Sequence, residues 1–116
     1  MDSPSPTVLV VDDDASIRLL CRLNLELDGW CVQEAGTLQQ ARAELDAHDV
    51  CVVLLDVHVG ADSGLAFLDE LRRERPRLKV ALMTGSADVR GTASDGVIPK
   101  PFTIEQLTST VANLAG

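Results

Sequence analysis

The sequence is poor in aromatic side chains and in basic residues, and each shortage excludes a class of protein. Aromatic residues make up 3% of the 116 positions and hydrophobic residues 46%, so the single domain that this length allows must have an aliphatic core. Ten Lys and Arg face 18 Asp and Glu, which leaves a net charge of −8. This balance argues against nucleic acid as a partner, because phosphate binding requires clustered cations.

Cysteines are few, and long apolar runs are missing. Cys21, Cys31 and Cys51 lie in apolar segments without metal-ligand spacing, so we expect buried, reduced thiols in a cytoplasmic protein. Residues 1–6 have neither the positive region nor the apolar region of a signal peptide. We expect them to form a disordered lead to one domain, residues 7–116. No apolar run reaches the length of a membrane span, so we expect no membrane partner.

The most informative stretch is an apolar run, residues 50–55, that ends in the carboxylate of Asp56. Six consecutive apolar residues are typical of a strand buried on both faces, as in the centre of a parallel sheet. Ligand sites in open parallel sheets lie beyond the carboxyl ends of the strands. Asp56 is therefore the first candidate for chemistry, although an isolated aspartate in this position also suits a helix cap or a turn.

Strands and helices are expected to alternate along the whole chain, which is typical of an open parallel α/β sheet. The expected strands are 7–11, 30–34, 50–56, 78–83 and 97–99, and the expected helices are 15–28, 37–47, 64–74 and 103–114. Only 12 residues separate Thr84 from Val97, so any helix there has one or two turns. Pro99 is compatible with its strand only at the edge of the sheet.

Apolar spacing assigns core faces to the helices. The residues expected to face the core are Ile17, Leu20, Cys21 and Leu25, then Leu38, Ala41 and Leu45, then Leu65, Leu68 and Leu71, and finally Ile104, Leu107, Val111 and Leu114. A second apolar line, Leu19, Leu23 and Leu27, lies on another side of the first helix. These leucines either pack at the rim of that helix or form a homodimer or partner surface.

Polar residues follow four of the expected strands. They are Asp12 and Asp13 after the first, Asp56 after the third, Thr84 after the fourth and Lys100 after the fifth. Three converging carboxylates need a counter-charge, and oxygen ligands of this kind suit Mg²⁺. A carboxylate, a divalent metal, a lysine and a hydroxyl are what phosphoryl transfer to an aspartate requires. Each residue alone also has a plain structural role, capping for the acids and a solvated position for Lys100.

These stretches resemble the receiver domain of two-component response regulators, and the resemblance covers nearly the whole chain. The matching segments are residues 9–14 (LVVDDD), 53–56 (VLLD), 82–85 (LMTG) and 100–102 (KPF). The resemblance implies a flavodoxin-like, doubly wound, five-stranded parallel sheet in the order 2-1-3-4-5. In this chain the fourth helix of that fold would be shortened.

The resemblance also implies roles for the residues at the strand ends. Asp56 would accept a phosphoryl group from a sensor histidine kinase or a phosphotransfer protein. Asp12, Asp13, Asp56 and the backbone carbonyl of His58 would bind Mg²⁺, and Thr84 and Lys100 would contact the phosphoryl group. The Lys100–Pro101 peptide would be cis. Such a domain is not an enzyme, since it assists only its own phosphorylation and dephosphorylation.

Three positions and one segment depart from the family's usual pattern. Gly60 replaces a common proline, which predicts a more mobile loop, and Pro99 removes a backbone donor from the fifth strand. The segment 85–96 is shorter than the family's fourth helix, and Val97 replaces the aromatic residue that reports phosphorylation. We therefore expect the signal to be read through another surface, such as the first helix.

Two other functions compete with a phosphoacceptor. One is a phosphorylation-independent pseudo-receiver that acts as an interaction or dimerisation module, which the extra leucine line favours. The other is an aspartate-nucleophile phosphatase. Such enzymes resemble one another in the motif Asp-x-Asp-x-Thr, which follows their first strand. In this chain the residue two positions after Asp56 is His58 and not an aspartate.

Overall fold

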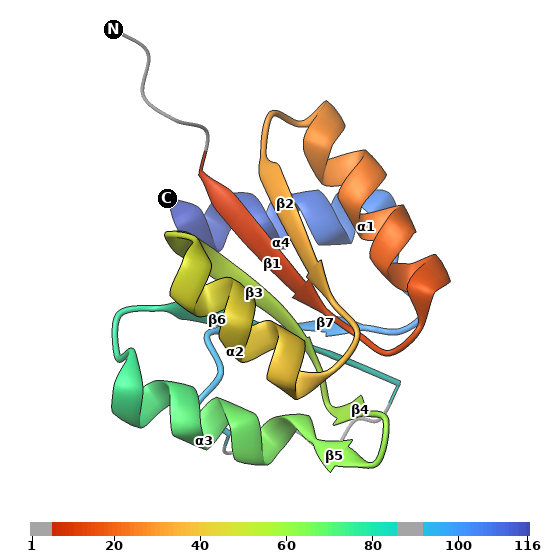
Figure 1. The fold of residues 1–116 in the computed structure, drawn as a ribbon. Helices are drawn as coiled ribbons and strands as arrows, with labels where there is room; N and C mark the ends of the chain where they lie inside the picture. Colours follow the sequence, from red (N-terminus) through yellow and green to blue (C-terminus); the bar gives the residue numbers. More distant parts are fainter. Residues whose placement is uncertain (1–5, 86–91) are drawn as a thin grey trace, which may run out of the picture.

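A five-stranded parallel sheet forms the centre of the computed structural model, which describes residues 6–85 and 92–116 (Figure 1). The strands are β1 (Thr7–Val11), β2 (Cys31–Ala35), β3 (Val50–Asp56), β6 (Lys79–Thr84) and β7 (Gly96–Pro99). They lie side by side in the order β2-β1-β3-β6-β7. Counted along the chain, this is the expected order 2-1-3-4-5, so the predicted fold is confirmed.

Helices cover both faces of the sheet. They are α1 (Ala15–Leu27), α2 (Leu38–Ala47), α3 (Gly64–Glu74) and α4 (Ile104–Ala115). Alternate residues of β3 point to opposite faces, so Val53 and Leu55 pack with α2 and α3 while Val52 and Leu54 pack with α1 and α4. The apolar run that ends at Asp56 is thus the central strand, buried on both sides as its sequence predicts.

Two of the residues predicted to face the core are instead exposed. Leu20 is 40% exposed and Ile104 is also 40% exposed, so both predictions are wrong. In α1 the buried line runs through Cys21 and Leu25, and Leu20 lies beside it at the edge of the packed face. Phe67, which the spacing did not assign to the core, is fully buried in α3. Apolar spacing defines the direction of a core face but leaves its borders open by about one residue.

Two sequence predictions concern the ends of the described ranges. The lead expected at residues 1–6 lies outside them except for Pro6, whose carbonyl oxygen accepts a hydrogen bond from the Cys31 amide at 3.0 Å. The shortened fourth helix falls on a stretch of which residues 86–91 are outside the described part; Gly85 and residues 92–95 are not helical. Strand β7 is at the sheet edge, where Pro99 is tolerated as expected. No helix among the described residues is long and apolar enough to cross a membrane.

Candidate functional site

The register of the sheet brings the predicted site residues to one edge. Val11 pairs with Leu55, so Asp12 and Asp56 are the next residues of adjacent strands. Asp56 in turn pairs with Met83, and Thr84 pairs with Pro99, which precedes Lys100. Carboxylate oxygens of Asp12, Asp13 and Asp56 all lie within 4.8 Å of one another.

Lys100 is the cation at the centre of this acidic cluster. Its Nζ donates to Oδ2 of Asp12 at 2.7 Å and lies 3.5 Å from Oδ2 of Asp56. Its backbone amide donates to the Thr84 carbonyl oxygen at 2.7 Å, so the ends of β6 and β7 are tied together. The Lys100–Pro101 peptide is cis, as the resemblance implies. Asp12 and Thr84 are buried, Asp56 and Lys100 are half-buried, and Asp13 is exposed.

Burial and the neighbouring charges change the pKa values of Asp56 and Lys100. Burial, together with the negative charge of Asp12, holds the pKa of Asp56 above its ordinary value, against the opposing charge of Lys100. For Lys100, burial works against the charged form, but the hydrogen bond and charge of Asp12 outweigh it and raise the pKa. Lys100 is therefore a permanent positive charge at neutral pH, and Asp56 is a carboxylate that would gain from a further cation.

The loop after Asp56 folds back over the site as a short antiparallel hairpin, β4 (His58–Val59) with β5 (Asp62–Ser63). Sequence reasoning expected a loop without strands here and so missed this hairpin, while the greater mobility expected from Gly60 stays a prediction. The His58 amide donates to Oδ1 of Asp56 at 3.4 Å, and the Gly60 amide donates to Oδ2 of Asp13 at 3.2 Å. A proline at position 60 has no N–H to give, so the glycine supplies an anchor that the common family residue lacks.

Gly64, the first residue of α3, allows the hairpin to return close to β3. A Cβ atom built on Gly64 would lie 2.0 Å from the Asp56 carbonyl oxygen, so no larger residue fits without moving the backbone. The Gly64 amide donates to the Val57 carbonyl oxygen at 2.7 Å. Gly64 thus packs closely against the backbone of Asp56 and Val57. The Ser63-Gly64 pair at the start of an apolar helix was the available sequence signal for this close approach.

Arg18 of α1 contacts the backbone of the carboxylate cluster at Asp12. One guanidinium nitrogen, Nη1, donates to the backbone carbonyl oxygen of Asp12 at 2.6 Å, and Nε donates to Glu34 of β2 at 3.3 Å. Arg22 binds the same glutamate at 2.7 Å. Gly36 leaves room for this arrangement, since a Cβ there would lie 3.0 Å from Nη1 of Arg18. Sequence reasoning missed this role of Arg18, because Asp12 lies before helix α1 and Glu34 lies in the strand that follows it.

The donor set fits a divalent cation. All three clustered side chains offer oxygen, which is the ligand type that Mg²⁺ prefers, and one of them, Asp13, is open to solvent. The raised pKa of Asp56 reflects, after burial, the charge of Asp12, a repulsion that a bound cation relieves. The cluster therefore combines the right ligand chemistry with an electrostatic need for positive charge.

Comparisons with known proteins show what the whole chain is similar to. The family model described as the response regulator receiver domain matches residues 8–112. The probable transcriptional regulatory protein TcrX of Mycobacterium tuberculosis is 35% identical over 91% of this chain and 48% of its own length. The sensor kinase CckA of Brucella abortus is 32% identical over 97% of this chain and 13% of its own length. The chain thus spans less than half of either relative.

Solved structures agree with this match. The receiver domain of NtrX from Brucella abortus is 28% identical, covers 93% of this chain and 97% of its own, and superposes with a TM-score of 0.85. The response regulator TrrA from Thermotoga maritima, in complex with Mg²⁺ and BeF, is 26% identical, covers 94% of this chain and 98% of its own, and has a TM-score of 0.85.

Proposed function

The chain belongs to the response regulator receiver domain family, and from this premise we propose that Asp56 accepts a phosphoryl group from a histidine kinase or a phosphotransfer protein. Receiver domains are signalling domains of two-component systems rather than classical enzymes. The observation that carries the proposal is the meeting of three carboxylates with Lys100 at one sheet edge. The three free thiols of the chain are compatible with a reducing compartment, and we place the domain in the cytoplasm.

In the proposed step, a carboxylate oxygen of Asp56 attacks the phosphorus of a phosphohistidine. The new P–O bond gives an acyl phosphate while the P–N bond breaks and its electron pair leaves with the imidazole. Lys100 already lies 3.5 Å from Oδ2 of Asp56, so its ammonium meets the charge on the transferred group. The Thr84 hydroxyl, at the end of the adjacent strand, is assigned a hydrogen bond to the same group.

We assign a Mg²⁺ site to Asp12, Asp13, Asp56 and the backbone carbonyl of His58. When bound, the ion neutralises charge on the phosphoryl oxygens. The chain's own part is to hold these ligands in place. Asp12 is held by Lys100 and by the Asp14 amide at 2.9 Å, and Asp13 by the Gly60 amide. Removal of Mg²⁺ with a chelator should therefore stop phosphorylation without unfolding the domain.

Incubation with acetyl phosphate and Mg²⁺, followed by intact-mass measurement, tests the proposal. We expect one phosphoryl adduct on the wild type, none on Asp56→Asn, and an unchanged adduct on Asp69→Asn, which alters an exposed aspartate of α3. A wild-type protein without adduct would favour the phosphorylation-independent module. Multiple turnover of phosphate esters would point instead to a phosphatase.

A second role, as an interaction module, is favoured by the outer face of α1. Leu19, Leu23 and Leu27 are 45%, 50% and 87% exposed, so they do not serve as core residues. Side chains of this size seldom gather on a surface without a partner. We propose that this face, rather than the segment 85–96, mediates homodimerisation or binding of a signalling partner.

The leucine face is tested with Leu23→Glu, compared with Gln39→Glu, which adds the same charge to an exposed position of α2. Sedimentation and kinase-binding measurements should show loss of association for the first variant only, with circular dichroism unchanged in both. Unchanged self-association and unchanged partner binding in Leu23→Glu would refute this role.

A further inference from the structure

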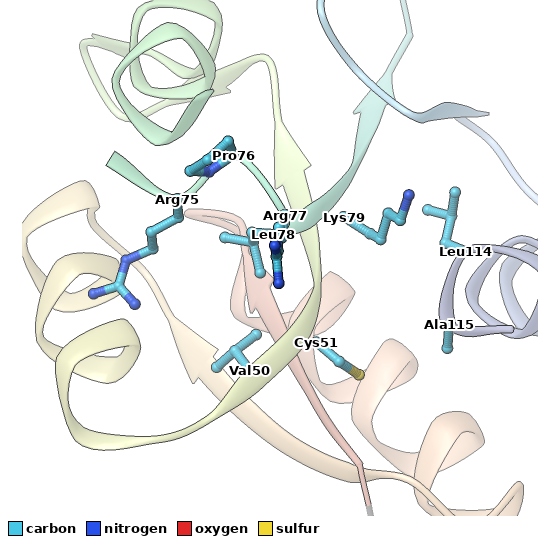
Figure 2. Close-up of a pocket in the computed structure, with 9 residues that line it drawn as sticks. All are labelled: Val50, Cys51, Arg75, Pro76, Arg77, Leu78, Lys79, Leu114 and Ala115. Carbon is cyan, nitrogen blue, oxygen red and sulfur yellow. The ribbon is translucent and has the colours of Figure 1, made fainter. Parts of the chain in front are cut away.

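A hollow lies at the opposite end of the sheet from Asp56. It has a volume of about 500 Å³ and is lined by residues at the starts of β3 and β6 and by the end of α4 (Figure 2). Val50, Leu78 and Leu114 provide apolar walls, and Cys51 lies beside them. A cavity of this size is within the range of small-molecule sites, which bury an apolar body and orient it with a few polar groups.

Positive charge is concentrated around this hollow. Residues 72–79 hold five of the ten basic residues of the chain, although the protein as a whole carries a charge of −8. Arg72 is paired with Asp95 and Arg75 with Asp46, so the charges of these two arginines are already matched within the chain. Arg77 and Lys79 form no ion pair with any residue that the structure describes, and both line the hollow.

The directions of the side chains place Arg77 and Lys79 at the hollow itself. In Figure 2 the Lys79 side chain extends toward Leu114, and Arg77 points toward the space between Val50 and Cys51. The Arg75 side chain instead points away from Lys79 and Leu114, and it binds Asp46 at 2.8 Å. A ligand in the hollow therefore meets apolar walls and two available cations.

We propose that this hollow binds a small carboxylate that carries an apolar body, such as an aliphatic or aromatic acid. The carboxylate pairs with Arg77 and Lys79, and the apolar body packs against Val50, Leu78 and Leu114. The site is separate from the phosphoacceptor, because β3 places Val50 and Asp56 at its two ends, about 20 Å apart for a seven-residue strand. Its occupancy does not depend on phosphorylation of Asp56.

Titration of the ¹⁵N-labelled domain with octanoate, followed by amide chemical shifts, tests this site. We expect saturable shifts at Cys51, Leu78, Lys79 and Leu114. Acetate, which lacks the apolar body, and octyltrimethylammonium, which has the opposite charge, should leave these amides unshifted. The double variant Arg77→Gln/Lys79→Gln should bind octanoate at least about tenfold more weakly, since it loses both charged partners.

Arg73→Gln is the matched control, because Arg73 belongs to the same basic stretch but does not line the hollow. It should leave octanoate binding unchanged, and Asp56→Asn should also bind normally. Non-saturable shifts, shifts at other residues, or equal weakening by Arg73→Gln and by the double variant would each overturn the proposal. A full set of wild-type-like amide peaks in the double variant verifies that it is folded.

Discussion

The carboxyl ends of the strands, here called the carboxyl edge, are rich in acidic side chains, and the amino ends, here called the amino edge, are rich in basic ones. The charged side chains at the two edges differ in how deeply they are buried. At the carboxyl edge, Asp12 and Lys100 are 1% and 24% exposed and bind each other at 2.7 Å. At the amino edge, Arg75 and Asp46 are 38% and 78% exposed and form an ordinary surface pair. The difference teaches that burial, rather than the number of charges, decides how much the fold depends on a charged residue.

The largest expected difference between the edges is that between their two lysines. Lys100→Met leaves the Asp12 carboxylate buried without its cation, which should lower the free energy of unfolding by roughly 3–5 kcal/mol. Lys79→Met removes an exposed charge and should change it by less than about 0.5 kcal/mol. Urea denaturation of both variants measures the difference. Equal losses in the two variants would remove the contrast between the edges.

Two glycines provide the next comparison. Gly64→Ala places a Cβ 2.0 Å from the Asp56 carbonyl oxygen, and we expect a loss of about 1–3 kcal/mol together with slower phosphorylation. Gly96→Ala, at the start of β7, meets its nearest neighbour only at 3.6 Å. Thermal unfolding should show little change for that control. A Gly64→Ala domain with wild-type stability would mean that the hairpin does not need this close approach.

Two arginines, one near each edge, should also differ in how much they contribute to stability. Arg18→Met removes hydrogen bonds to the Asp12 carbonyl and to Glu34, at a cost of about 1–2 kcal/mol, and should slow adduct formation from acetyl phosphate. Arg75→Met breaks only an exposed pair and should cost less than about 0.5 kcal/mol.

Gly36→Ala, which crowds the Arg18 guanidinium, should also slow the formation of the phosphoryl adduct. Adduct formation at the wild-type rate in both Arg18→Met and Gly36→Ala would show that Arg18 stabilises the fold without positioning Asp12.

A smaller effect concerns the pH dependence of stability. Because the folded state holds the pKa of Asp56 above the ordinary value of 3.8, the folded state binds this proton more tightly than the unfolded chain. Stability from this group is therefore present in acid and is lost as the pH rises through the folded pKa. Asp56→Asn should be more stable than the wild type at pH 7, with the gap closing toward pH 3.

The measurement is the free energy of unfolding of the wild type and of Asp56→Asn from pH 3 to pH 7. Asp69→Asn, measured in the same way, is the control. A gap that widens in acid would contradict the sign of the shift.

The smallest effects are expected from the three thiols. Burial raises the pKa of Cys21 to about 12, and burial also raises that of Cys51, whereas Cys31 is exposed. Alkylation followed by mass spectrometry should label Cys31 first, Cys51 more slowly, and Cys21 only after unfolding. Octanoate should slow labelling of Cys51 alone, which links this series to the hollow at the amino edge. Labelling of Cys21 at the rate of Cys31 would contradict this order.

The fold could be predicted because its signals are local. The apolar run before Asp56, the cap residues Ser63 and Thr103, and the capping box of Thr103 with Gln106 all act within a few residues. The prediction that all three thiols are buried was wrong for Cys31, which is exposed in β2. Whether a half-apolar strand turns a given residue outward depends on what packs against it, and the sequence around Cys31 does not contain that information.

The sequence by itself determined the alternation of strands and helices and the residues that end each strand, because backbone propensity and apolar period are properties of neighbouring positions. Only the tertiary structure decided that Lys100 binds Asp12 rather than solvent, that Arg18 supports the carbonyl of Asp12, and that Gly60 anchors Asp13. These contacts join residues 6 to 88 positions apart. They follow from strand register and loop path, which arise when the whole sheet packs between its helices.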